Sequence, residues 1–174
     1  MKKLLVLFIF IFYSCVDDRD FSTDDVVVTP EYRLNFVNFQ FNANAINQGN
    51  LSTENQMADF AEVDFLREDI NVDYLETVSF QVYIENSINQ PLEINFKFFN
   101  PQDEIVYEYT RNIDSGETDV PFTEEFTIDL SADEVAAITE AFTLQANFSQ
   151  PQENNQQGEF SLQSTVEFSY KFTL

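Results

Sequence analysis

The chain has 174 residues, of which 44% are hydrophobic, and this size and composition suit one domain with one core. It carries 31 acidic residues against 8 Lys and Arg, a formal net charge of −23 that repels a phosphate backbone and excludes nucleic acid as a partner. With no His, one Cys and three Gly, the chain also lacks the residues for a catalytic triad, a zinc site of thiolates or imidazoles, or a glycine-rich phosphate loop.

The N-terminus has the pattern of an export signal. Lys2 and Lys3 precede an apolar run at residues 4–13, far shorter than the roughly 20 residues that a membrane-spanning helix needs. The run ends at Ser14 and Cys15, a small residue and the only cysteine. This pair resembles the lipobox of bacterial lipoproteins, which implies a signal peptide at 1–14 and acyl chains on Cys15 that hold the protein in the outer membrane. The alternative is a plain signal peptide with a free cysteine.

Acidic residues follow this cysteine. Asp17, Asp18 and Asp20 resemble the signal that sends Bacteroidota lipoproteins to the cell surface; a simple solvated tether is the alternative interpretation. Residues 15–30 have no helical periodicity, and their repeated aspartates keep such a chain extended. We therefore expect a lipidated cysteine and acidic tether at 15–30, followed by a domain at 31–174 that is exposed on the cell surface.

From residue 31 onward, apolar and polar residues alternate with a period of two, which predicts half-buried β-strands. The clearest alternating segments are residues 78–84, 92–98, 105–109, 126–130, 142–148 and 160–174. Only Ser164 interrupts the apolar series of the last segment. In the first strand the apolar set changes phase between Phe36 and Val37, which predicts a bulge there or a segment buried on both faces. Residues 57–75 fit either a strand or a helical turn.

Turn and cap residues separate these segments. Asn, Pro, Asp, Gln and Gly cluster at 86–91, 100–103, 114–116 and 149–158, where we expect hairpin or corner connections. Ser131 and Glu134 form a capping-box pattern ahead of apolar residues at helical spacing, which predicts one short crossover helix at 132–140.

About eight strands and one small helix predict an all-β fold, an antiparallel β-sandwich of the immunoglobulin-like kind. A membrane-spanning β-barrel would give the same alternation. The sandwich is preferred because the chain has no Trp for an aromatic girdle, and because an acyl anchor would be superfluous in a protein that already spans the membrane.

Carboxylates are the abundant reactive side chains, so a glycosidase-like acid pair is the one acid–base arrangement that the composition permits. Pairs such as Glu104 with Glu108 and Glu124 with Glu125 fall in turns or on polar strand faces, where burial cannot raise a pKa. We therefore expect no enzymatic activity and no cofactor.

Two further groups of residues are candidates for binding. Asp114, Glu117 and Asp119 surround a glycine in a predicted turn and are the first place to look for calcium, which takes oxygen ligands alone; a polar hairpin tip is the simpler interpretation. Tyr83 and Phe99 fall on the polar faces of their strands, so they are candidate contact aromatics.

The sequence thus predicts a lipid-anchored protein of the outer membrane that works by contact with a protein partner. The first hypothesis is an accessory subunit of an envelope assembly, such as a transport, secretion or barrel-insertion machine. The alternative is a glycan-binding or adhesive surface module, for which we would expect a row of exposed aromatics on one sheet. The absence of Trp makes this alternative the second choice.

Overall fold

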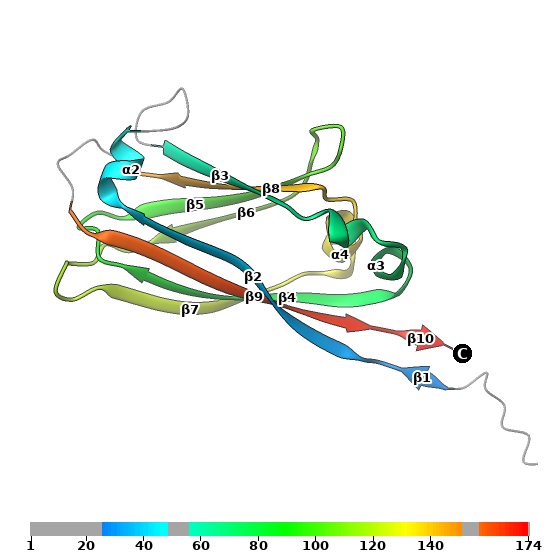
Figure 1. Cartoon of the computed structure of the whole chain (residues 1–174). Coiled ribbons are helices and arrows are strands. Elements are labelled where there is room, and N and C mark those ends of the chain that lie inside the picture. Colours follow the sequence, from blue (N-terminus) through cyan, green and yellow to red (C-terminus); the bar gives the residue numbers. More distant parts are fainter. Residues whose placement is uncertain (1–25, 49–55, 151–156, 174) are drawn as a thin grey trace, which may run out of the picture.

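A computed structural model describes residues 26–48, 56–150 and 157–173 of the chain. They form two four-stranded antiparallel sheets and a two-stranded ribbon (Figure 1). The strands are β1 (Val27–Val28), β2 (Glu31–Asn42), β3 (Gln56–Glu62), β4 (Leu75–Asn86), β5 (Leu92–Phe99), β6 (Ile105–Ile113), β7 (Phe122–Asp129), β8 (Thr143–Ser149), β9 (Glu159–Tyr170) and β10 (Phe172–Thr173). The helical segments are α2 (Ala43–Gln48), the 3-10 turn η2 (Asp64–Arg67), α3 (Asp69–Tyr74) and α4 (Ala132–Ile138).

The strand order within the sheets is β2-β9-β4-β7 in one and β3-β8-β5-β6 in the other. Successive strands from β2 to β9 alternate between the two sheets, except that β5 and β6 pair directly. This nested order is that of a jelly roll. The predicted antiparallel β-sandwich is confirmed. The chain does not have the immunoglobulin-like topology that its sequence suggested. In that topology, strands that are neighbours in the sequence pair within one sheet far more often.

The predicted turns take two different roles in this topology. Residues 100–103 form a hairpin between β5 and β6, in which the Asn100 side-chain oxygen accepts the backbone N–H groups of Gln102 and Glu104 at 3.0 and 2.9 Å. Asp103 takes a positive φ of 60° there, a conformation that aspartate tolerates better than most residues. By contrast, the connections at 86–91 and 114–116 carry the chain from one sheet to the other.

The predicted bulge in β2 is confirmed. The pairing with β9 shifts between Asn35 and Asn38, so that Phe36 and Val37 together lie opposite Ser164. The Val37 N–H donates to Ser164 Oγ at 3.2 Å, and the hydroxyl donates to the Val37 carbonyl at 3.3 Å. The serine that interrupts the apolar series of β9 therefore satisfies backbone groups that the bulge removes from the sheet ladder.

The crossover helix predicted at 132–140 is confirmed as α4, which joins β7 of one sheet to β8 of the other. The Ser131 N–H donates to Glu134 Oε2 at 2.7 Å, as the capping-box pattern predicts.

Residues 57–75 contain a strand, β3, followed by η2 and α3. Residues 15–30 were predicted as a tether, but Val27 and Val28 form β1 and pair with β10, so the ordered fold begins before Pro30.

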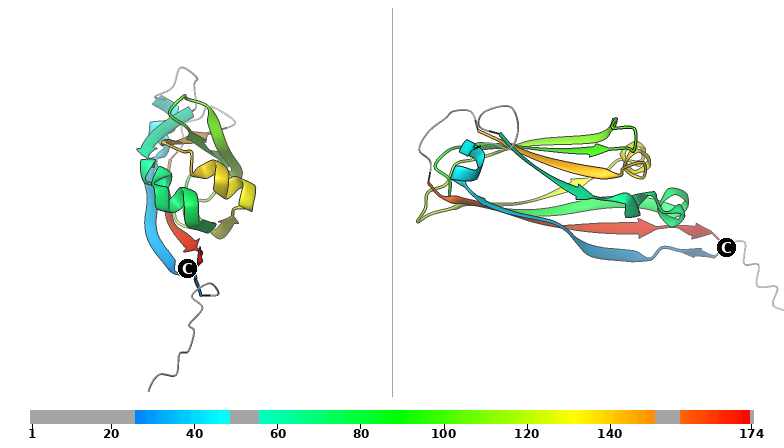
Figure 2. Two further views of the ribbon diagram at one scale, coloured as in Figure 1. Left: turned by 90° about the vertical axis from the view of Figure 1, so that its right-hand side faces the viewer. Right: turned by 45° about the horizontal axis from the view of Figure 1, so that its top comes forward.

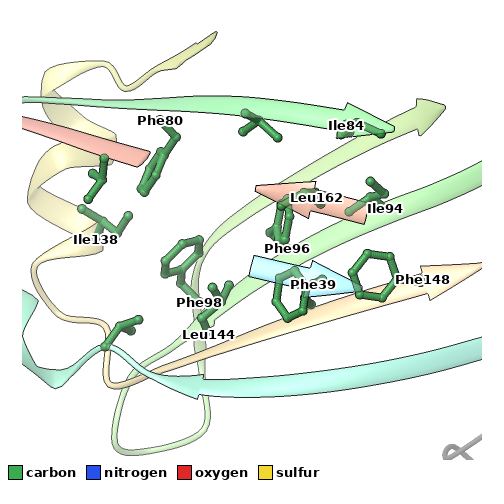
Figure 3. Close-up of a cluster of buried hydrophobic side chains, with 14 of the residues drawn as sticks. Phe39, Phe80, Ile84, Ile94, Phe96, Phe98, Ile138, Leu144, Phe148 and Leu162 are labelled. Atoms are coloured by element: carbon green, nitrogen blue, oxygen red, sulfur yellow. The ribbon is translucent and has the colours of Figure 1, made fainter. Parts of the chain in front are cut away.

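Phenylalanine rings from both sheets fill the space between them (Figure 3). Phe148 of β8 is fully buried and contacts three other rings, those of Phe39, Phe41 and Phe160, at centroid distances of 5.3, 4.9 and 5.6 Å. Burial of one such side chain stabilises a fold by about 1.5–3 kcal/mol. At one end of the sandwich, α3 and α4 lie side by side across the gap between the sheets (Figure 2).

Candidate functional site

The ends of β2 and β9, together with β1 and β10, project beyond the opposite sheet (Figures 1 and 2). β1 and β10 continue the antiparallel register of β2 and β9, with Val28 opposite Phe172 and Tyr32 opposite Phe168. We call the apolar surface of this projection the overhang and define it by the side chains of Val28, Tyr32, Leu34 and Phe172, together with Tyr74 of α3, which packs against Phe172. It lies at the end of the fold from which the chain leads back toward its N-terminus.

The overhang is exposed because its side chains point to the inner side of the sheet at a place where the other sheet has ended. Tyr32 and Leu34 pair with Phe168 and Val166, whose side chains are buried on the inner face. The facing edge strand, β3, ends at Glu62. Tyr32 and Leu34 therefore remain 55% and 50% exposed, although their alternation with polar residues suggests core positions.

Aromatic contacts hold the overhang together. The Tyr32 and Tyr170 rings meet edge to face at a centroid distance of 5.7 Å, and Tyr74 contacts Phe172 at 4.8 Å. The Tyr170 hydroxyl donates to Oδ1 of buried Asn71 in α3 at 2.5 Å, while Asn71 Nδ2 donates to the Phe65 carbonyl at 2.7 Å. Asn71 thus ties α3 to both β9 and η2.

Tyr170 itself is shielded from water at this junction. Burial raises the pKa of its hydroxyl above the usual value, and the nearby Tyr32 and Glu68 raise it further. The hydroxyl therefore stays protonated at neutral pH and remains a donor to Asn71.

The other side of the projecting strands is polar. Arg33 of β2 forms an ion pair with Glu167 of β9 at 2.9 Å, and Lys171 forms one with Glu76 at 3.5 Å. The projection therefore has one charged face and one apolar face. An exposed apolar face of this kind marks a site where the surface of another molecule can pack.

Exposed apolar residues concentrate at this end of the molecule. They include more than half of the exposed large hydrophobic side chains in the described part of the chain: Val26, Val27, Val28, Tyr32, Leu34, Ile70, Val72 and Tyr74. A cleft of about 170 Å³ lies beside the overhang, lined mainly by apolar residues that include Leu34, Val63, Phe65 and Val166. The arrangement can bind an apolar or aromatic protein surface.

The structure does not bring the sequence-predicted binding residues together. Cys15, Asp17, Asp18 and Asp20 lie outside the described residues. Tyr83 is 42% exposed on the outer face of the sheet that contains β4, whereas Phe99 is half-buried on the outer face of the other sheet. Because β4 and β5 belong to different sheets, the two aromatics cannot share a contact patch.

The candidate calcium ligands lie around a tight turn. The backbone carbonyl of Asp114 accepts a hydrogen bond from Asn86 Nδ2 at 2.8 Å. Glu117 and Val120 form an isolated antiparallel β-bridge through their backbones. Within residues 26–48, 56–150 and 157–173, no three acidic side chains come close enough to hold a metal ion, so the structure does not bring the carboxylates of Asp114, Glu117 and Asp119 together.

In each acidic pair considered for catalysis, at least one member is engaged in a structural contact. Glu108 accepts a hydrogen bond from Asn95 at 2.7 Å, and Glu124 forms an ion pair with Arg111. The Arg111 guanidinium in turn lies 4.0 Å from the centre of the Phe126 ring. These carboxylates therefore stabilise the strands on which they lie.

Sequence reasoning did not identify Tyr32, Leu34 and Tyr74 as exposed. Their apolar character and spacing are those of core residues. The endpoint of β3 distinguishes Tyr32 and Leu34, whereas Tyr74 is the last residue of α3. The nearest signal is local: Pro30 precedes the strand, and the phase change at Phe36 marks where the covered part of β2 begins.

None of the helices in the described residues has the length and apolar character required to cross a membrane.

No family model and no curated protein matches the chain. Among solved structures, it is similar to a Parabacteroides distasonis protein provisionally described as secreted, with a TM-score of 0.47 and 7% identity over 64% of this chain and 36% of that one. A structure of infectious bursal disease virus, Gx strain, gives a TM-score of 0.43 and 13% identity over 81% and 32% of the two chains. Tailspike protein 4 of bacteriophage CBA120 gives 0.39 and 10% over 80% and 19%. All three TM-scores are below 0.5, and these similarities identify neither a family nor a function.

Proposed function

We propose that the protein is a lipid-anchored lipoprotein of the outer membrane, exposed on the cell surface, that acts by protein contact as an accessory subunit of an envelope assembly. It performs no chemistry of its own in this role. The observation that carries the proposal is the overhang, an apolar surface at the end of the fold nearest to Cys15 in the sequence.

The tether limits what the overhang can reach. The eleven residue steps between Cys15 and Val26 span at most ~36–40 Å when fully extended. With acyl chains on Cys15, the overhang stays near the membrane, where an integral membrane protein is the first large apolar surface available. Bare lipid is a poorer partner, since Glu31, Asp69 and Asp73 lie in the segments that carry the overhang and anionic headgroups repel them.

Affinity purification tests the proposal. The protein is extracted from its native cells in mild detergent and captured with an antibody, because a C-terminal tag would sit beside the overhang. We expect one membrane protein to be recovered in a fixed ratio with the wild type. Changing Tyr32→Ser together with Leu34→Ser should abolish this recovery.

The matched control changes two equally exposed apolar residues elsewhere. Phe60 and Ile105 lie on the outer face of the other sheet, and Phe60→Ser with Ile105→Ser should leave recovery intact. Recovery of the protein alone, or equal loss in both double variants, would contradict a contact through the overhang.

A further inference from the structure

A row of polar side chains crosses the outer face of the sheet β2-β9-β4-β7, with Tyr83 in its middle. Tyr83 pairs with Gln163 of β9 on one side and with Glu125 of β7 on the other, and Gln163 pairs in turn with Asn38 of β2. Since neighbouring strands lie about 4.8 Å apart, the row is about 14 Å long.

A second row lies beside the first and contains Asn35, Thr165 and Gln81. The bulge in β2 places Asn35 and Asn38 on the same face although they are three positions apart. Side chains of the two rows line a groove of about 490 Å³.

The amide groups of this groove have unused hydrogen-bonding capacity. Among the described residues, the side chains of Asn35, Asn38, Gln81 and Gln163 form no hydrogen bond, and Glu125 forms no ion pair. Each amide can offer two donors and an acceptor to a ligand.

The outer face of the other sheet is different, because its polar groups bind one another. Asn95 Nδ2 donates to Glu108 Oε1 and to Thr110 Oγ1, both at 2.7 Å, and Asn147 donates to Asn95 at 3.4 Å. Polar groups also bind one another further along the face that carries Tyr83, where Ser79 donates to Asp129 at 2.8 Å. The amides that line the groove do not.

Charge and geometry narrow the class of ligand. Glu125 is the single charged residue that lines the groove, and Arg33 on the same face is already paired with Glu167 at 2.9 Å, which disfavours an anion. The backbone of the two inner strands is fully committed to the sheet, so an added peptide strand would gain no ladder of hydrogen bonds on this face. A neutral saccharide offers hydroxyl donors and acceptors to the amides and an apolar ring face to Tyr83.

We propose that this groove binds a short neutral oligosaccharide, with Tyr83 against a sugar ring and the amides of Asn38, Gln81 and Gln163 bonded to its hydroxyls. This site is separate from the overhang and does not depend on a partner there. The protein can hold a glycan on one face while its membrane-proximal end contacts a protein.

Affinity electrophoresis of the detergent-solubilised, full-length protein tests the proposal. The gels contain one of four neutral polysaccharides (amylopectin, mixed-linkage β-glucan, xylan or galactomannan) or one of two acidic ones (alginate or polygalacturonate). We expect retardation in at least one neutral gel and none in the acidic gels. Tyr83→Ala should weaken the retarding interaction about tenfold, as loss of one aromatic contact does, and Gln163→Ala should weaken it as well.

Phe60→Ala is the matched control, because it removes an exposed aromatic from the outer face of the other sheet. It should leave retardation unchanged, and all three variants should melt with the wild type. Absence of retardation in every neutral gel, retardation in acidic gels alone, or equal loss in Phe60→Ala and Tyr83→Ala would overturn the proposal.

Discussion

The hydrogen bond between Tyr170 and Asn71 should make a measurable contribution to stability, because it joins α3 to the end of β9. Tyr170→Phe removes the hydroxyl that donates to Asn71 Oδ1 at 2.5 Å and leaves this oxygen, in a residue that is 6% exposed, without another donor among the described residues. An unsatisfied buried acceptor costs about 1–3 kcal/mol. For a chain of this size, that corresponds to a melting temperature lower by roughly 2–12 °C.

Urea unfolding followed by circular dichroism measures this effect. Tyr83→Phe is the control, since it also removes one tyrosine hydroxyl, but an exposed one that forms no hydrogen bond with the described residues. We expect Tyr83→Phe to change the free energy of unfolding by about 0.5 kcal/mol or less. If Tyr170→Phe were equally harmless, the assignment of Asn71 as the residue that fixes α3 would be wrong.

Three further perturbations test the fold. Phe148→Ala empties the centre of the ring cluster and should lower the free energy of unfolding by about 3–5 kcal/mol, whereas exposed Phe60→Ala should change it by about 0.5 kcal/mol or less; similar losses in denaturant titrations would argue against the core. Gly116→Ala would place a Cβ 1.9 Å from the Asn86 carbonyl oxygen and should lower the free energy of unfolding by about 1–3 kcal/mol. An unchanged midpoint in the same titration would show that this turn has room for the added Cβ. Burial, with smaller effects of nearby Glu134 and Tyr109, raises the pKa of Tyr107 from 10.0 to about 12. Folding therefore favours the neutral phenol. The contribution of this shift to the free energy of unfolding is complete below pH 10 and is lost as the pH rises toward 12. Tyr107→Phe should therefore make the alkaline loss of stability shallower, and superimposable pH profiles would contradict this.

Strand positions could be predicted from the sequence because the alternation of apolar and polar residues indicates which side chains face the core. The same reasoning pointed to Phe36 and Val37, where the change of phase predicted a bulge or a segment buried on both faces, and the structure shows the bulge. The capping box at Ser131 located α4 in the same way. Each of these features leaves a pattern within a short stretch of the sequence, although the bulge itself is completed by Ser164 of β9.

The strand order could not be predicted, because alternation specifies a face and not a partner. The turn at 86–91 has the composition of a hairpin, yet β4 pairs with β7 and β9. For the same reason the row of Asn38, Gln163, Tyr83 and Glu125 is invisible in the sequence, where its members are scattered over four strands. The exposure of Tyr32 depends on where a strand of the other sheet stops, which is also a long-range property.

The most direct test of the proposed contact is site-specific photocrosslinking in intact cells. A photoreactive phenylalanine analogue replaces Tyr32 in the overhang or, as the control, Phe60 on the opposite sheet. After irradiation, we expect position 32 to give one discrete adduct with an outer-membrane protein, and position 60 to give none with that protein. No adduct from position 32, or the same adduct from both positions, would contradict the conclusion that the overhang is where this protein meets its partner.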